Sequence, residues 1–171
     1  MIESRRLKLI PLNLDMLDQY LALDGSLEES LELIPYPRTI TDDLHSALKH
    51  VIIPRVRMGI QDFHFSTIWT AIHKEKRVMV GDICFKGKPD GMGRVELGYG
   101  TYPDFQQQGY MSEMVEAMSA WAFTQPRVKV VLAETNEDNK ASQKVLVNNG
   151  FIHFETKLGM KWWKLVKGRK S

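Results

Sequence analysis

The chain has little cysteine, little net charge and no long apolar run. Its single cysteine, Cys84, lies inside an apolar segment, so no intramolecular disulfide can form and a buried, reduced thiol is expected. The net charge is only +2, and Lys and Arg are scattered apart from a short group between Lys164 and Lys170. No stretch approaches the roughly 20 apolar residues of a membrane span, and the first residues lack a signal-peptide run. These absences predict a cytoplasmic protein that binds neither nucleic acid nor a membrane.

Linkers rich in Pro, Gly and Ser, internal repeats and low-complexity segments are also missing. With 171 residues, 43% of them hydrophobic, the chain is long enough for one full core and short for two sizeable domains. The sequence therefore predicts one domain over residues 1–171. The histidines show no spacing typical of metal ligands, so no metal site is expected.

Hydrophobic spacing and turn residues predict the order of strands and helices. The expected strands cover residues 6–12, 65–72, 78–85, 95–102, 128–133, 151–157 and 161–166. The expected helices begin near Asn13, Thr41, Gly109 and Asn139, and Pro54 is expected to end the second of them. The first strand reads as an edge strand, whereas the continuous apolar run at 128–133 suggests a central strand buried on both faces. This order predicts an α/β fold of the α+β type, with a mixed, mostly antiparallel sheet of about seven strands and helices on both faces.

The segment "FQQQGYMSEM", residues 105–114, changes from a polar elbow to a helical pattern. A helix that starts near Gly109 leaves its first backbone N–H groups without partners, and these groups form a site for an anion such as a pyrophosphate. The alternative is an ordinary strand-to-helix turn in which the glycine only relieves strain. The segment matches neither the dinucleotide fingerprint nor the P-loop, so another phosphate-bearing ligand is indicated.

A second motif follows the apolar strand. Asn136, Asn139 and Ser142 are spaced three residues apart around a helix start, and Gly150 and Phe151 close that helix. Together with "VELGYGTYPDFQQQGYMSE", this motif resembles the GNAT superfamily of acyl-CoA-dependent N-acetyltransferases. The detailed form is most similar to the branch that contains the ribosomal-protein N-terminal acetyltransferases.

The resemblance implies a CoA site and a mixed GNAT sheet. Gln106, Gly109 and Met111 match the family loop whose amides hold the CoA pyrophosphate, although Met111 replaces a small residue and Gln107 stands where glycine is frequent. Tyr99 and Thr101 would present backbone groups to the pantetheine arm from a strand splayed away from its neighbour. The full set of expected cofactor-binding residues is Tyr99, Gly100, Thr101, Gln106, Gln107, Gln108, Gly109, Tyr110, Met111, Ser112, Asn136, Asn139 and Ser142.

The same resemblance implies acetyl-CoA as acyl donor and a primary amine, on a protein N-terminus or a small molecule, as acceptor. Direct attack in a ternary complex needs a proton acceptor, and Glu96 occupies the position where the family often places one. Its alternative is a strand carboxylate paired with Arg94 or a lysine. An amide of Tyr99 or Gly100 would face the developing oxyanion, and Ser142 is the best-placed hydroxyl for the leaving thiolate.

Two other classes remain open at the level of sequence. One is a CoA-binding sensor or interaction module without catalysis, and the other is a phosphate-binding or nucleic-acid-binding protein unrelated to CoA. The acceptor is expected to contact the first two helices, the "IPYP" connector, the "KGKPDGMG" loop and the last hairpin. No specificity motif identifies it, and a homodimer is possible.

Overall fold

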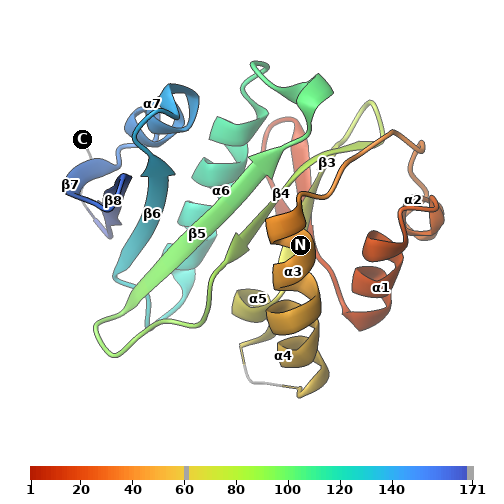
Figure 1. Ribbon diagram of the computed structural model, residues 1–171, viewed down its shortest axis with the longest axis horizontal. Helices are drawn as coiled ribbons and strands as arrows, with labels where there is room; N and C mark the ends of the chain where they lie inside the picture. Colours follow the sequence, from red (N-terminus) through yellow and green to blue (C-terminus); the bar gives the residue numbers. More distant parts are fainter. Residues whose placement is uncertain (60–61, 169–171) are drawn as a thin grey trace.

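The computed structural model describes residues 1–59 and 62–168 and contains one mixed sheet (Figure 1). Its strands run in the order β1-β2-β3-β4-β5-β6-β8-β7. Among the described strands only β5 and β6 pair in parallel, which confirms the prediction of a mixed, mostly antiparallel sheet. The strands are β1 (Ile2–Glu3), β2 (Leu7–Pro11), β3 (Ile68–His73), β4 (Val78–Phe85), β5 (Arg94–Thr101), β6 (Val130–Asn136), β7 (Ile152–Lys157) and β8 (Met160–Val166).

Helices cover both faces of the sheet, as predicted: α3 and α4 lie in front of the strands in Figure 1, and α6 lies behind β5. The helices are α1 (Leu14–Ala22), α2 (Ser26–Ser30), α3 (Asp42–Ala47), α4 (Ile53–Arg57), α5 (Phe63–Ser66), α6 (Tyr110–Thr124) and α7 (Lys140–Asn148). Side-chain caps start α1 and α3, because Asn13 accepts from the Met16 amide and Thr41 from the Leu44 amide. None of the helices in the described residues is long and apolar enough to cross a membrane.

Three of the predicted strands differ from the structure. The strand after Arg6 is not an edge strand, because β1 pairs outside it. The segment at 65–72 begins as helix α5, and β3 starts only at Ile68. Burial alternates along β6, so the prediction of burial on both faces is wrong: α6 contacts β6, whereas Val130, Leu132 and Glu134 remain half-buried.

Pro54 does not end the second predicted helix. A π-helical turn, Leu48–Ile52, follows α3 directly, and α4 continues with Pro54 in its first turn. Proline is tolerated there because the backbone N–H groups in the first turn of a helix have no intrahelical acceptor, so the missing N–H of proline costs little. The π-helical turn before it also changes the spacing of the backbone hydrogen bonds.

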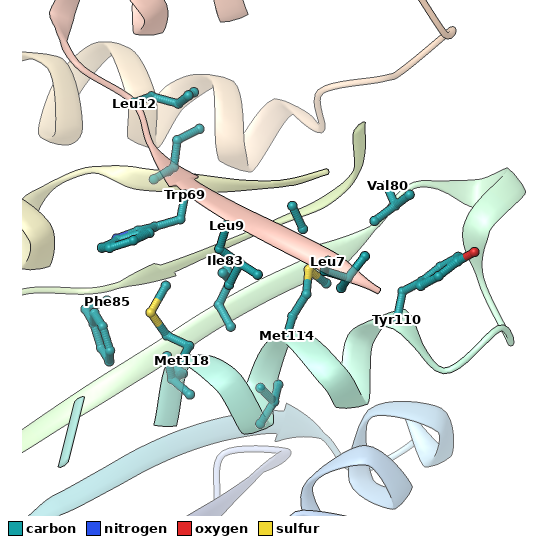
Figure 2. Packing of buried hydrophobic residues seen from close by; sticks show 14 of the residues in the cluster. Leu7, Leu9, Leu12, Trp69, Val80, Ile83, Phe85, Tyr110, Met114 and Met118 are labelled. Carbon is teal, nitrogen blue, oxygen red and sulfur yellow. The ribbon is translucent and has the colours of Figure 1, made fainter. Parts of the chain in front are cut away.

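The main core lies between the sheet and α6. Leu7 and Leu9 are two residues apart in β2 and both point toward α6. Met114 and Met118 are one turn apart on that helix (Figure 2). Met114 is fully buried. Because α6 carries the elbow at its N-terminus, this packing fixes where the elbow lies relative to the strands.

Replacing Met114 by alanine should therefore lower the free energy of unfolding by about 2–5 kcal/mol, since the buried side chain leaves a cavity. The matched control is Met92→Ala, because Met92 is 61% exposed in the β4–β5 hairpin and should change stability by about 0.5 kcal/mol or less. Urea denaturation followed by circular dichroism measures both. Equal effects of the two variants would contradict this placement of α6 against the sheet.

Candidate active site

Strands β5 and β6 separate in the middle of the sheet. Their pairing runs only from Arg94 opposite Val130 to Leu97 opposite Ala133, although β5 continues to Thr101 and β6 to Asn136. On the other side of β5, the Lys86 amide donates to the Glu96 carbonyl and the Tyr102 amide donates to the Val80 carbonyl. Backbone groups alternate in direction along a strand. The N–H and C=O groups of Tyr99 and Thr101 therefore face the gap that β6 leaves open.

The elbow before α6 opens onto the same gap. Gly109 is the N-cap of α6 with φ +80°, and Gln107 also adopts a left-handed conformation, with φ 59°. In the described part of the chain, no amide from 107 to 112 donates a hydrogen bond to the protein. The first amides of α6 are therefore free to bind an anion.

Helix α7 faces the elbow across the gap. The Asn139 side chain caps this helix by accepting from the Ser142 amide at 3.0 Å, which fixes Ser142 in the first turn. The Ser142 hydroxyl lies 2.9 Å from the Tyr99 hydroxyl. Burial raises the pKa of Tyr99 to about 12, despite the opposing effect of Ser142, so this phenol is protonated at neutral pH. The sequence indicated only the backbone of Tyr99, and the structure adds its hydroxyl.

A cavity of about 640 Å³ lies between these three segments. Most of the predicted cofactor residues line it, namely Tyr99, Thr101, Gln106, Gln107, Gly109, Tyr110, Met111, Ser112, Asn139 and Ser142. Lys144 and Asn148 on α7 line it as well and were not predicted. Tyr110 contributes little side chain, because its ring is buried beneath Arg6. Met111 fits beside Thr101, whose hydroxyl lies 3.6 Å from the Met111 sulfur.

Three predicted cofactor residues lie outside this cavity. Gly100 lines a different cavity on the opposite face of β5. Gln108 turns away, since its side chain donates to the Asp104 carbonyl. Asn136 is exposed at the end of β6, where its carbonyl accepts from Gln143.

Arg6 holds the elbow and is not identifiable from the sequence. Its guanidinium donates to the Gln108 carbonyl at 3.0 Å and to Glu113 at 2.8 Å, and it lies 4.5 Å above the Tyr110 ring. Burial alone would raise the pKa of Glu113, but hydrogen bonds from Arg6 and Ser4 lower it. The turn between β1 and β2, through Ser4 and Arg6, thus ties the elbow to the first turn of α6.

A second cavity, of about 490 Å³, lies on the face of β5 toward α3. Gly98 and Gly100 of β5, Cys84 and Asp82 of β4, and residues of the 39–44 segment line it. It shares Tyr99, Thr101 and Gln106 with the first cavity, so the two cavities meet where β5 leaves β6.

Comparison with known proteins identifies the family of this arrangement. The family model described as "Acetyltransferase (GNAT) domain" matches residues 6–152. The chain belongs to the GNAT acetyltransferase family.

Individual relatives of this GNAT chain agree with the family match. It is 32% identical over 95 residues to the uncharacterized N-acetyltransferase YjdG of Bacillus subtilis, a match that covers 56% of each chain. A second B. subtilis relative, YoaA, is 25% identical over 48% of this chain and 47% of its own length, so the chain spans about half the length of these two curated relatives.

Solved GNAT structures share the fold. An acetyltransferase of the GNAT family from Bacillus anthracis superposes with a TM-score of 0.66 at 17% identity, over 98% of this chain and 99% of its own. RimL, a ribosomal L7/L12 alpha-N-protein acetyltransferase solved with coenzyme A, superposes with a TM-score of 0.66 at 18% identity, over 95% of each chain.

Glu96 of this GNAT chain lies in a third hollow, between β5 and the β7–β8 hairpin. The Lys86 ammonium is 2.5 Å from its Oε1 atom and also contacts Glu134. Burial alone would lower the pKa of Lys86, but the two carboxylates raise it. The lysine pairing considered for Glu96 is therefore present. Among the described residues, no group of three His, Cys, Asp or Glu side chains is arranged to hold a metal ion.

Asp82, which the sequence analysis missed, is the most buried acid near the gap. Its Oδ2 atom accepts from the Tyr20 hydroxyl at 2.6 Å and from the Tyr102 hydroxyl at 2.8 Å. Burial raises its pKa, and the two hydroxyls only partly oppose that effect. No local motif marks this residue, because its partners come from α1 and from the end of β5.

The raised pKa of Asp82 predicts a pH effect on stability. A carboxyl whose pKa is higher in the folded state stabilises the fold below the unfolded-state pKa, and this contribution is lost as the pH rises through the folded-state pKa. The Asp82→Asn variant has no such titration. From about pH 3 to neutral pH, the unfolding free energy of the wild type should therefore fall relative to that of the variant. Urea denaturation at several pH values measures this, and parallel pH dependences of the two proteins would contradict it.

Proposed function

We propose that the protein is an acetyl-CoA-dependent N-acetyltransferase that acetylates a primary amine by direct attack in a ternary complex. The observation that carries this proposal is the gap between β5 and β6, which opens onto the unpaired amides at the start of α6. Family membership supports the assignment. A module that only binds CoA is the second candidate, and the ion pair between Lys86 and Glu96 favours it.

The residues of the first cavity fit CoA. The amides of Gly109, Tyr110, Met111 and Ser112 would bind its pyrophosphate, because the N-terminus of a helix attracts an anion. The backbone groups of Tyr99 and Thr101 in the gap would bind the pantetheine amides in the manner of a neighbouring strand. When bound, acetyl-CoA supplies the thioester that donates the acetyl group.

The chain's own groups provide the remaining functions near the gap. The Tyr99 amide faces the gap and can donate to an oxygen that gains negative charge, whereas the Gly100 amide points toward β4, opposite Asp82. The hydroxyls of Tyr99 and Ser142, joined at 2.9 Å, can pass a proton to a leaving thiolate.

Glu96 is proposed as the proton acceptor for the amine, directly or through water. Its side chain lies on the same face of β5 as Gly98 and Gly100, which line the second cavity. Lys86 keeps Glu134 as a partner when Glu96 becomes neutral, so proton uptake does not leave the lysine unpaired.

The acceptor is a protein N-terminus or a small amine. The structural neighbours include RimL, named for a protein N-terminus, and a chimera of spermidine N-acetyltransferase. The second cavity, which meets the CoA cavity at Tyr99, is the proposed place of the acceptor.

Acetyl-CoA or CoA at about 100 times its dissociation constant should stabilise the protein by roughly 2.7 kcal/mol, whereas ATP should not. Gly109→Val should abolish most of this shift, because a branched side chain covers the anion site. Gly25→Val is the matched control, since Gly25 is also a helix N-cap, has φ 86° and lies away from the cavity. Both variants should lose stability from backbone strain, but only Gly109→Val should lose the CoA shift in differential scanning fluorimetry. No shift of the wild type with either CoA species would reject the proposal.

Glu96→Gln should lower kcat/KM for a verified amine by about 10²–10⁴-fold at neutral pH, with CoA affinity unchanged, because the proton acceptor is lost. Raising the pH should restore part of the rate. Glu134→Gln is the comparison variant: it leaves the proton acceptor in place but leaves Lys86 unpaired when Glu96 is neutral, so the rate should fall by only about fivefold or less, the effect of an exposed ion pair. Equal losses in the two variants would mean that Lys86, Glu96 and Glu134 have only a structural role. A wild-type protein that binds CoA but turns over no amine would favour the binding module.

A further inference from the structure

The side chain of Lys86 crosses from β5 to β6 at the point where these strands separate. The last parallel pair is Leu97 opposite Ala133, so Gly98 and Glu134 are the first residues beyond it. A Cβ atom built on Gly98 would lie 3.9 Å from Lys86 Cε, and the Lys86 ammonium contacts Glu134. Because Gly98 has no side chain, it does not separate this ammonium from the narrow end of the gap.

The same ammonium covers the carboxylate proposed as proton acceptor. The Glu96 Oε1 atom is buried, and apart from the Lys86 ammonium at 2.5 Å no group of the described residues donates a hydrogen bond to it. An amine from outside must displace Lys86 to reach this oxygen. Lys86 is itself a primary amine and already lies within the distance of proton transfer.

A pantetheine arm held by the elbow would end near this ammonium. The elbow follows Thr101 in the chain, so the arm passes Thr101 first and Tyr99 next, toward Gly98. An arm that pairs with the backbone of β5 lies in the plane of the sheet, and its end is open to the face on which Lys86 lies. Tyr99 and Gly98 are about 3.3 Å apart along the strand. The Lys86 side chain is 44% exposed and flexible, so it can move over such a distance.

We propose that Lys86 is a self-acetylation site, at which the protein transfers the acetyl group of acetyl-CoA to its own Nζ atom. This inference rests on the proposed acetyltransferase function and adds a modification site to it. Glu96 removes one proton from the ammonium, and the Nζ lone pair attacks the thioester carbon. The N–C bond forms and the C–S bond breaks, the nitrogen loses a second proton, and coenzyme A leaves as a thiol with that proton. The products are acetylated Lys86 and coenzyme A, and no oxidant or further reactant is needed.

Lys86 should react slowly at neutral pH, because only the neutral amine attacks. Burial alone would lower the pKa of Lys86, but Glu134 and Glu96 raise it, so the neutral form is scarce. The same hollow is also lined by the charged side chains of Lys88, Asp90, Arg94 and Glu155. The rate of self-acetylation should therefore rise by about tenfold per pH unit above neutral pH, until the pKa of Lys86 is reached.

Peptide mass spectrometry after incubation with acetyl-CoA, without an added amine, tests the proposal. Lys88 is the internal control, since it is exposed in the same hairpin and takes part in no ion pair among the described residues. Lys86 should be acetylated at least about tenfold faster than Lys88, because it is positioned beside a proton acceptor. Its first-order rate constant should not change with protein concentration. Equal rates at the two lysines, or a rate constant that rises with protein concentration, would overturn the proposal.

Competition and two variants test the roles of the site. Excess coenzyme A should suppress acetylation of Lys86 and leave Lys88 unchanged, and equal suppression would contradict a reaction at the gap. Glu96→Gln should slow acetylation of Lys86 by about tenfold or more, because the proton acceptor is lost. Glu134→Gln is the matched control: it also removes one carboxylate from the ammonium, but it keeps the acceptor, so the pKa of Lys86 falls and labelling should be faster. Equal rates in the two variants, with folding checked by circular dichroism, would reject Glu96 as the acceptor.

The two proposals fail separately. Absence of CoA stabilisation in scanning fluorimetry rejects the acetyltransferase function. CoA stabilisation, or turnover of an outside amine, with Lys86 unmodified rejects self-acetylation and leaves CoA binding in place.

Discussion

The short pairing between β5 and β6 is the constraint on which the rest of the site depends. A parallel pair that continued to Thr101 would satisfy the backbone groups of Tyr99 and Thr101 and close the sheet. Because pairing stops at Leu97 and Ala133, these groups have no strand partner, and the start of α6 and the start of α7 lie on either side of the opening. The same break joins the two cavities. A continuous sheet would separate them completely.

Side chains alternate along β5, so the two faces of the sheet carry different groups beside the gap. Large side chains, Leu97 and Tyr99, point toward α6 and α7 and fix the strand against them. On the other face, Gly98 and Gly100 have no side chains, and this leaves space for the cavity beside Asp82 and Cys84. Burial raises the pKa of the Cys84 thiol to about 11, so this group is a neutral part of the cavity wall at neutral pH. Burial therefore favours the neutral form of both Cys84 and Asp82 on that face.

Sequence reasoning succeeded where chemistry is carried by neighbours in the chain. The elbow from Gln106 to Gly109 and the cap from Asn139 to Ser142 are local motifs, and each one sits where its spacing predicts. Strand β1 was missed because two residues carry almost no periodic signal. The prediction that Pro54 ends a helix was wrong, because proline breaks the interior of a regular α-helix. Here Pro54 lies in the first turn of α4, directly after a π-helical turn.

The residues that sequence reasoning missed depend on contacts between distant segments. Arg6 reaches Glu113 and Gln108 more than a hundred positions along the chain, and Tyr20 reaches Asp82 across 62. Both contacts connect the N-terminal third to the candidate site: one holds the elbow beside the first cavity, and the other holds Asp82 at the wall of the second cavity. Burying Asp82 costs free energy of folding, since an apolar residue at this position would need no hydrogen bonds. Local rules are broken most often where a protein binds or reacts, so the cost at Asp82 itself supports a functional reading of that face.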